Sequence, residues 1–417
     1  MTQEKRVMKH DERPAAWSFI KGDRYQEIEG TTEYPVMYRA LGTKPATQHP
    51  FNLYKDILTE PTVLKATFEV VEVHIKKIAE EMVTREIDHV VQIGMGTSQF
   101  IGQVVAPALW KYAGMSAEDF DSVEFLNYDQ PYDIEHTAFF FYSGSGSTFD
   151  TISAAKKVKE LGGYSLAFTS IAESPLTKVT SATIACVGGF DTGGSDTFHY
   201  CTRLGASLRL ALELGSLKFP DSPKFEWSKL KTQLLEVPDL MAQRMEYIDK
   251  RSRSMAKMYK SMRSVIIVGS GPNIGTAEEM ALKFEEMAHI PAKAMVPTRH
   301  LHGALGLTDE KILTVILAPE TPSRKWLVQI AKVTQMLKTP SIGIIPENEH
   351  EIADMMDYVV RVPFTDEYLF ALFVVPAIQL FPYYCGVEQG DINPDCQRSN
   401  IPKYARVWDM VLPPGGH

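Results

Sequence analysis

The chain has 417 residues, of which 44% are hydrophobic and 23% charged, so it is too long for one ordinary core and suggests two globular domains of roughly 150 to 200 residues each. Its formal net charge of −9 and its lack of a Lys/Arg cluster argue against a nucleic-acid partner. No apolar run approaches the roughly 20 residues that a membrane-spanning helix needs, and the polar start leads into no signal segment, so we expect a cytoplasmic protein without a membrane partner.

The N-terminal part of the chain changes character at about residue 50. Residues 1–50 are polar and rich in proline and charge, show no sustained hydrophobic period, and are interpreted as an extension. From Asn52 to about Met82 apolar residues recur at helical spacing, interrupted by Pro61. Because proline disrupts the interior of a helix, this pattern predicts a helix, a turn and a second helix.

Four short apolar runs then occur twice, about 175 residues apart. In the first pair, His89–Gly94 and Ser264–Gly269, a β-branched run enters a Gly-x-Gly turn in both copies. The other pairs are Ala138–Tyr142 with Leu313–Leu317, Tyr164–Phe168 with Ser341–Ile345, and Ala182–Val187 with Asp357–Val362. The repeat predicts four strands in each half of the chain, in nearly the same register.

Helical patterns such as Thr151–Leu161 and Lys325–Leu337 lie between these runs. Because alternating strands and helices are typical of a parallel sheet covered on both faces, we predict an α/β fold with two tandem doubly wound, three-layer domains. We expect the domains at 51–225 and 226–390, a bridging helix over Trp227–Met262, and a tail, 391–417, over the active site. Ligands are expected past the carboxyl ends of the strands.

An anion-binding loop is predicted directly after the strand Ala138–Tyr142. Its residues are Ser143, Gly144, Ser145, Ser147 and Thr148. They combine several hydroxyl donors, unhindered backbone N–H groups and the start of a helical pattern, which suits a phosphate or sulfonate group. Helix capping alone would need one hydroxyl rather than four. The sequence therefore predicts that the first half holds an anion.

The second half is expected to supply acid–base groups. Its equivalent stretch, Ala318–Ser323, contains two prolines and a glutamate, which disfavour anion binding. Glu279, Lys283 and Glu286 share one helix face at i, i+4 and i+7, whereas Glu285 turns about 100° away. A solvated ladder of Glu–Lys pairs would show the same spacing.

No cofactor and no metal are predicted. The two Gly-x-Gly turns lack the full GxGxxG spacing of a dinucleotide site. His300 and His302 alternate in a predicted loop, but no further His or Cys lies close to them in the sequence. A histidine at this place is more simply a proton donor or a packed side chain.

From about residue 50 to its end, the chain resembles the tandem sugar isomerase (SIS) domains of glucosamine-6-phosphate synthase and related stand-alone deaminases, deglycases and ketose–aldose isomerases. The family's sugar-phosphate loop, Ser-x-Ser-Gly-x-Thr, is matched by Ser143, Ser145, Gly146 and Thr148, and its Gly-Thr-Ser turn by Thr97 and Ser98. The family's helix and the histidine after it are matched by Glu279, Lys283, Glu286 and His302. Its near-terminal Asn-Leu-Ala-Lys motif resembles Asn400-Ile-Pro-Lys403.

The resemblance implies an aldose–ketose isomerase-type enzyme that acts on a six-carbon sugar with an anionic C6 group, a phosphate or a sulfonate. In that reading His302 opens the ring, Glu286 moves a proton between C1 and C2, Lys403 polarises the carbonyl or forms an imine, and Lys283 holds Glu279 and Glu286. It also implies a homodimer with shared active sites. An amino-sugar-phosphate deaminase or deglycase and a non-catalytic sugar-phosphate sensor are the alternatives.

The chain also departs from the synthase. The glutaminase domain is absent, so we expect no glutamine-dependent amide transfer. Arg299 stands where the synthase has an acidic residue before the active histidine, which favours a more anionic substrate. Pro402 replaces the alanine that precedes the tail lysine.

Overall fold

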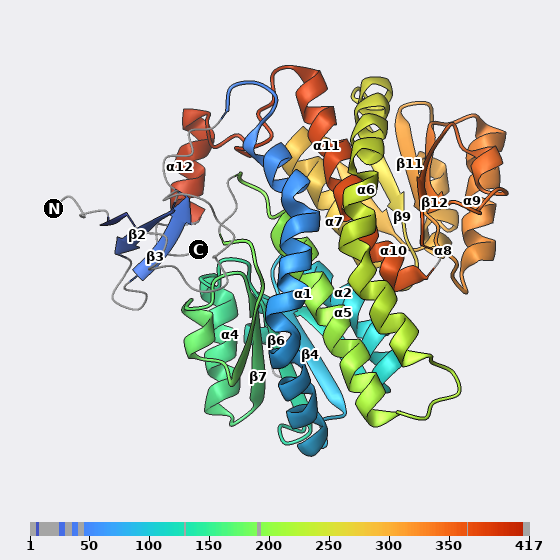
Figure 1. Ribbon diagram of the computed structural model, residues 1–417. Coiled ribbons are helices and arrows are strands. Elements are labelled where there is room, and N and C mark those ends of the chain that lie inside the picture. Colours follow the sequence, from blue (N-terminus) through green and yellow to red (C-terminus); the bar gives the residue numbers. More distant parts are fainter. Residues whose placement is uncertain are drawn as a thin grey trace.

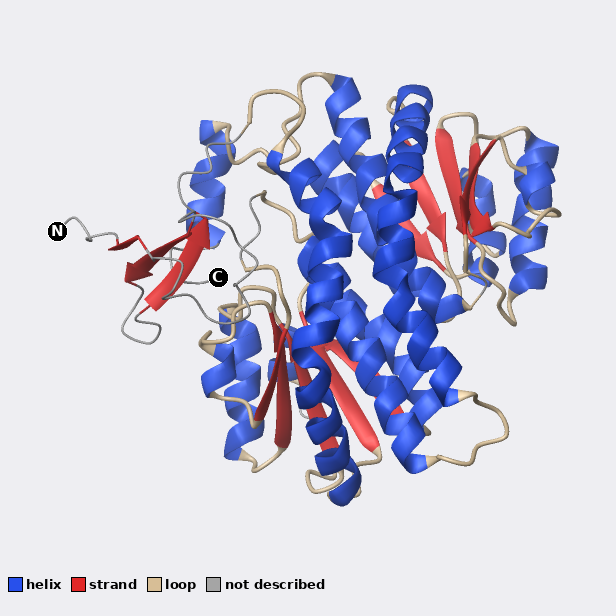
Figure 2. Cartoon of the chain, viewed as in Figure 1, coloured by secondary structure: helices blue, strands red, loops and turns tan. Residues whose placement is uncertain are grey.

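The computed structural model describes residues 6–7, 25–29, 36–40, 46–128, 131–189, 193–364 and 366–411. Two parallel sheets lie on either side of a group of long helices (Figures 1 and 2). This arrangement confirms the predicted α/β fold with two doubly wound halves.

The first sheet has the strand order β5-β4-β6-β7-β8, and all its neighbouring strands are parallel. Its strands are β4 (His89–Gly94), β5 (Ser116–Asp121), β6 (Thr137–Tyr142), β7 (Tyr164–Thr169) and β8 (Ala182–Ala185). Every residue of the central strands β6 and β7 is buried, because helices cover both faces of the sheet.

The second sheet has the equivalent order, β10-β9-β11-β12-β13. Its strands are β9 (Ser264–Val268), β10 (Ala292–Met295), β11 (Ile312–Leu317), β12 (Ser341–Pro346) and β13 (Tyr358–Val362). All eight apolar runs that the sequence singled out are strands, whereas β5 and β10 were missed. Both missed strands lie at an edge of their sheet, where less burial is required and the apolar signal is weak.

Long helices fill the space between the sheets. They are α1 (Asn52–Thr84), α5 (Phe198–Lys218), α6 (Trp227–Tyr259) and α11 (Val375–Gln389), and Figure 1 shows them at the centre of the molecule. Helix α1 packs on α5 and α6, and α6 packs on α11. The helix predicted over Trp227–Met262 is confirmed as α6.

The prediction that Pro61 divides the first helical stretch was wrong, because α1 runs unbroken through it. A proline inside a helix costs about 3 kcal/mol. The apolar face of α1, which includes Ile57, Leu64 and Phe68, is almost fully buried, and burying each such side chain contributes roughly 1.5 to 3 kcal/mol. Tertiary packing therefore outweighs the local preference.

The remaining helices are shorter than these four. They are α2 (Thr97–Ala108), α3 (Ser122–Asn127), α4 (Phe149–Glu160), α7 (Asn273–Lys283), α8 (Pro297–Leu301), α9 (Arg324–Leu337), α10 (Glu367–Phe373) and α12 (Pro402–Val411). Two of them continue into π-helical turns, α2 into Leu109–Ala113 and α7 into Phe284–Ala288. Short 3-10 turns occur at Leu176–Lys178, Ala304–Leu307 and Ala353–Met355.

The N-terminal extension contains three strands that its sequence did not predict. β1 (Arg6–Val7), β2 (Tyr25–Glu29) and β3 (Val36–Ala40) form a separate antiparallel sheet. The stretch Trp17–Ile20 of this extension lies outside the described residues. Within the described ranges no single helix is long and apolar enough to cross a membrane, although the bent pair α10 and α11 together has the length and composition to do so.

Candidate active site

The acid–base candidates of the second half form a buried ionic cluster on α7 and the turn after it. The fully buried Lys283 ammonium donates to the Glu286 carboxylate at 2.8 Å and lies 3.3 Å from the Glu279 carboxylate. Glu279 is also fully buried, whereas the Glu286 side chain keeps 18% of its surface exposed. Because Lys283 and Glu279 are fully buried, the cluster is not a solvated Glu–Lys ladder. Glu286 is the residue of the cluster that a ligand can reach.

Burial and mutual charge set the protonation of this cluster. Desolvation raises the pKa of Glu279 to about 7, because Lys283 offsets burial only in part and the charges of Glu286 and Asp196 add to it. Burial would lower the pKa of Lys283, but the three carboxylates outweigh it and hold that pKa above its usual value. Lys283 is therefore a permanent cation that orients Glu286.

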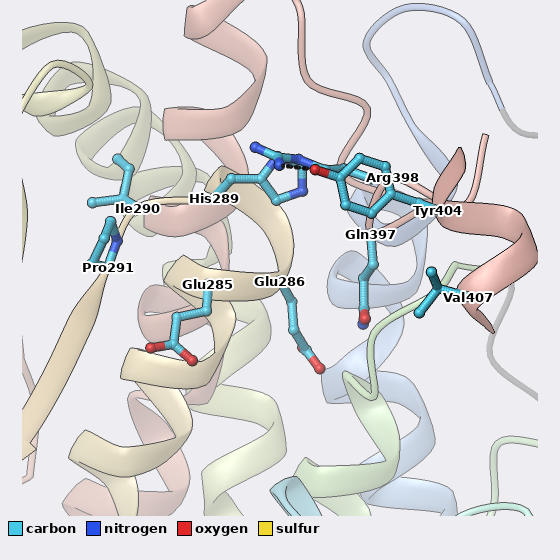
Figure 3. Close-up of a pocket in the computed structure, with 9 residues that line it drawn as sticks. All are labelled: Glu285, Glu286, His289, Ile290, Pro291, Gln397, Arg398, Tyr404 and Val407. Carbon is cyan, nitrogen blue, oxygen red and sulfur yellow. Dashed lines mark hydrogen bonds between the residues drawn. The ribbon is translucent and has the colours of Figure 1, made fainter. Parts of the chain in front are cut away.

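A π-helical turn presents the two neighbouring glutamates. Helix α7 ends at Lys283, and the turn Phe284–Ala288 follows it, closed by His289 in the left-handed region at φ 53°. π-helical turns are frequently found at functional sites. Glu285 and Glu286 point in different directions from the turn (Figure 3), yet both line the same pocket. The expectation that Glu285 turns away from the site face was therefore only partly correct.

The predicted anion loop joins the end of β6 to the start of α4. Ser143 Oγ lies 2.9 Å from Thr148 Oγ1 and accepts a hydrogen bond from the Gly146 N–H at 3.0 Å. The Ser147 hydroxyl donates to Ser145 Oγ at 2.8 Å. Thr148, the N-cap of α4, makes no side-chain capping bond, so it does not occupy the N–H groups of the first helical turn.

Two glycines allow this loop to pack closely on its neighbours. A Cβ at Gly144 would lie 2.5 Å from the Nδ1 atom of His199. Gly146 has φ +63°, and a Cβ there would lie 2.0 Å from Ser174 Oγ. No side chain fits at either position, so the loop backbone lies directly against α5 and the segment after β7.

Sequence reasoning missed three charged or polar residues at the start of α5. Arg203 is fully buried, ion-pairs with Asp196, and donates from Nε to the His199 carbonyl at 2.9 Å. His199 is buried too, and its Nδ1 lies 3.7 Å from Asp196 Oδ1. The signal in the sequence was the pair His199 and Arg203, whose i, i+4 spacing places them on one face of α5, with Asp196 just before the helix.

Contacts to the turn after β4 connect the two halves of the site. Lys283 Nζ of the second half donates to Thr97 Oγ1 at 3.0 Å, and Arg203 donates to Ser98 Oγ at 2.7 Å. Because His199 lies against Gly144 of the anion loop, an unbroken set of contacts runs from this loop through α5 and Thr97–Ser98 to Lys283 and Glu286. The structure thus brings together residues that are far apart in the sequence.

The C-terminal tail lies over the Glu286 end of this network. A pocket of about 690 Å³ is lined by Glu285, Glu286, His289, Ile290, Pro291, Gln397, Arg398, Tyr404 and Val407 (Figure 3). Arg398 donates to His289 Nδ1 at 3.2 Å and to the Tyr404 hydroxyl at 2.9 Å. Gln397 donates to the Gly194 carbonyl at 2.6 Å. The tail is therefore anchored to both halves.

Two candidate residues do not join the cluster within this chain. Lys403 is exposed on α12 and is not among the residues that line the pocket. His302 is exposed at the end of α8, which packs against α9 and the 3-10 turn Ala304–Leu307. His300 is fully buried, so the two histidines do not face the same environment, and in the described part of the chain no group of three or more His, Cys, Asp or Glu could hold a metal ion.

Known proteins resemble this chain in sequence and in fold. The glutamine–fructose-6-phosphate aminotransferase (isomerizing) of Thermococcus kodakarensis is 26% identical over 361 residues, which are 86% of this chain and 58% of that relative. The chain thus spans a little over half the length of this curated relative. The C-terminal domain of glucosamine-fructose-6-phosphate aminotransferase from Francisella tularensis matches with a TM-score of 0.75 at 18% identity, covering 83% of this chain and 98% of that one.

A second solved structure, tagatose-6-phosphate ketose/aldose isomerase from Escherichia coli, matches with a TM-score of 0.70 at 17% identity, covering 85% of this chain and 97% of that one. At these identities the solved structures show a shared fold alone. The model of the SIS domain matches residues 85–195 and 257–385, which are the two sheet-containing halves and more than half of the chain. The chain therefore belongs to the SIS domain family.

Proposed function

We propose that this protein is an aldose–ketose isomerase-type enzyme that acts on a six-carbon sugar with an anionic group at C6. The observation that carries the proposal is the Lys283 ammonium, which is bonded to Glu286 on one side and to Thr97, next to the anion-loop network, on the other. A base and an anion cradle joined by a buried cation suit a substrate held at one end and deprotonated at the other.

In the proposed reaction the Glu286 carboxylate removes the proton from C2 of the open-chain aldose while O1 gains a proton, which gives the enediol. The Glu286 carboxyl then gives a proton to C1 while O2 loses its proton, which gives the ketose. The reverse transfer converts the ketose, and no oxidant is needed because C2 is oxidised as C1 is reduced. The proton held on Glu286 exchanges with solvent while the enediol is bound, so solvent deuterium can enter the sugar. Acid–base steps of this kind contribute about 10² to 10⁴-fold each. Lys283 orients Glu286, and Ser143, Ser145 and Thr148 bind the C6 anion with the N–H groups of α4.

His302 would complete the site in an assembly of two subunits, and Lys403 would complete it in a closed state of the tail. His302 is exposed, and Val296 and Leu307, which lie within six residues of it in the sequence, leave 40% and 62% of their surface exposed. Such apolar exposure around a polar group suits a subunit interface, so we propose a homodimer in which His302 opens the sugar ring in the partner's site. Lys403 would polarise the C2 carbonyl.

A deaminase or deglycase on the same scaffold is the second candidate. The pocket of about 690 Å³ beyond Glu286 is large compared with what a hexose ring alone needs and lies within the range of ligand sites. It would hold an amine or amino-acid substituent at C1 or C2. Proton transfer by Glu286 would be common to both reactions.

Incubation with a panel of hexose and hexosamine 6-phosphates and 6-sulfo sugars in deuterium oxide tests the proposal. We expect deuterium at C1 or C2 of the accepted sugar, and release of ammonia or an amino acid would favour the second candidate. Ser145→Ala with Thr148→Val should raise KM at least tenfold while the melting temperature stays nearly unchanged. An unchanged KM with a lowered melting temperature would contradict the anion-loop assignment.

A further inference from the structure

The internal repeat of the chain extends to its π-helical turns. Leu109–Ala113 in the first half and Phe284–Ala288 in the second half lie 175 residues apart, which is the spacing of the repeated strands. Each turn continues a helix and is closed by a residue in the left-handed region, Gly114 at φ 60° and His289 at φ 53°. The first turn is therefore the structural counterpart of the turn at the candidate active site.

Lys111 occupies in the first turn the position that Glu286 occupies in the second, and it too lines a pocket. This pocket, called the Lys111 pocket below, has a volume of about 500 Å³, within the range of ligand sites. It is lined by Lys111, Tyr112, Gly114, Phe219, Ser222, Pro223, Lys224 and Phe225. Four of these residues, at positions 111, 114, 222 and 223, stand 175 positions before residues that line the pocket at Glu286. Each half thus has a pocket between its π-turn and the segment after α5 or α11.

The Lys111 pocket lies away from the candidate active site. One of its walls is the loop between α5 and α6, which Figure 1 shows at the opposite end of the molecule from α12, the helix beside the Glu286 pocket. The two sets of lining residues do not overlap. The Lys111 pocket is therefore a separate cavity and not an extension of the active site.

The charged residues among those that line this pocket are Lys111 and Lys224. The Lys111 ammonium lies 3.6 Å from the Asp366 carboxylate and 4.0 Å from that of Glu367, and it donates no hydrogen bond within the described residues. Lys224 is exposed and forms no ion pair with a residue that the structure describes. Neither carboxylate lines the pocket, so a ligand there first meets two ammonium groups that still have protons to donate.

Aromatic rings form the apolar part of the lining. Phe219 leaves 43% of its surface exposed and lies against Gly114, where a Cβ would be 3.0 Å from Phe219 Cζ. The ring of Phe225 lies 5.4 Å from that of Tyr112, centre to centre. None of the lining residues is Asp, Glu, Asn or Gln, so their side chains offer few acceptors for the hydroxyl groups of a sugar. These walls suit a flat aromatic group better than a sugar ring.

We propose that the Lys111 pocket is a second ligand site, which binds a flat aromatic molecule that carries an anionic group. The two ammonium groups pair with the anion, and the exposed phenylalanine ring stacks on the aromatic group. Nucleotides and aromatic carboxylates share this chemistry. The proposal does not depend on the proposed reaction, because no residue of the catalytic cluster lines this pocket.

Isothermal titration calorimetry of the full chain with adenosine 5′-monophosphate and with indole-3-acetate tests the proposal and distinguishes the two sources. Adenosine lacks the anion and ribose 5-phosphate lacks the aromatic group, so each should bind at least about tenfold more weakly than adenosine 5′-monophosphate if the nucleotide is the ligand. Tighter binding of indole-3-acetate would identify an aromatic carboxylate instead. Binding of neither aromatic anion, or equal binding of the nucleotide and ribose 5-phosphate, would overturn the proposal.

Two lysine variants locate the bound ligand. Lys224→Ala and Lys111→Gln should each weaken binding of the aromatic anion at least about tenfold, and Lys224 is exposed, so its loss should leave the fold intact. Lys229→Ala is the matched control, since Lys229 is also exposed but does not line the pocket. Arg398→Ala removes the cation of the Glu286 pocket, and both controls should bind as the wild type does. An equal loss in Lys229→Ala, or a loss in Arg398→Ala alone, would overturn the assignment to the Lys111 pocket.

Discussion

Replacement of Glu286 by glutamine separates the chemical role of this residue from its structural role. The amide keeps the shape of the side chain and an oxygen that can accept from Lys283, at the position where the carboxylate now lies 2.8 Å from Nζ. It removes the base. We therefore expect kcat to fall about 10³-fold, or about 4 kcal/mol of transition-state stabilisation, with little change in KM.

The effect of this substitution on stability should be much smaller than its effect on catalysis. Lys283 keeps Glu279 at 3.3 Å and its bond to Thr97. The charge of Glu286 is one of the causes that raise the pKa of Glu279, so its removal favours the ionised form of Glu279 and strengthens that remaining pair. The ion pair with a carboxylate becomes a hydrogen bond from the ammonium to a neutral amide, which costs roughly 1 kcal/mol.

The assay measures deuterium incorporation at C1 and C2 by NMR under single-turnover conditions, together with the melting temperature. Glu285→Gln is the matched control, because Glu285 lines the same pocket but is exposed and points elsewhere (Figure 3). It should retain nearly full turnover. Normal turnover in Glu286→Gln, or an equal loss in Glu285→Gln, would refute the assignment of the proton shuttle.

Three further predictions concern stability and loop geometry. The pKa of Glu279 rises from 4.5 to about 7 on folding, so the folded state keeps this proton to higher pH than the unfolded state, and stability is lost as pH rises from about 4.5 to 7. The free energy of unfolding of Glu279→Gln relative to wild type should therefore increase by about 2 to 3 kcal/mol between pH 5 and 8. A difference that does not change with pH would contradict the pKa shift. Asp395 accepts hydrogen bonds from the N–H groups of Asn52 and Leu53 at 2.9 Å and so caps α1. Asp395→Ala should lower the free energy of unfolding by roughly 1 to 2 kcal/mol in urea titrations. An effect no larger than that of Asp391→Ala would speak against the cap. Gly146→Ala should abolish anion binding because the added methyl group would collide with Ser174. Gly162→Ala, at φ +79° with open space around it, should show only backbone strain of about 1 to 2 kcal/mol. Equal anion binding by the two variants would disprove the packing argument.

Local sequence determined eight of the strands, the anion loop and one helix face. Four of the eight apolar runs, β6, β7, β11 and β12, are fully buried strands, so their hydrophobicity alone marks them. The serine-rich loop follows from the end of β6 and the start of α4, both of which are local signals. The ionic face formed by Glu279, Lys283 and Glu286 follows from helical spacing, which the π-turn after Lys283 alters without separating Lys283 from Glu286.

Only tertiary structure decided which distant residues meet. Arg203 and Ser98 are 105 positions apart and Lys283 and Thr97 are 186 apart, so no periodic pattern in the sequence records these contacts. Pro61 remains inside α1 because the buried face of that helix outweighs the local cost of a proline. The protonation of Glu279 depends on its burial and on the charges of Lys283, Glu286 and Asp196, the last of which comes from the other half of the chain. Sequence patterns report the preferences of neighbouring residues, whereas burial and charge at this site arise from the packing of the whole chain.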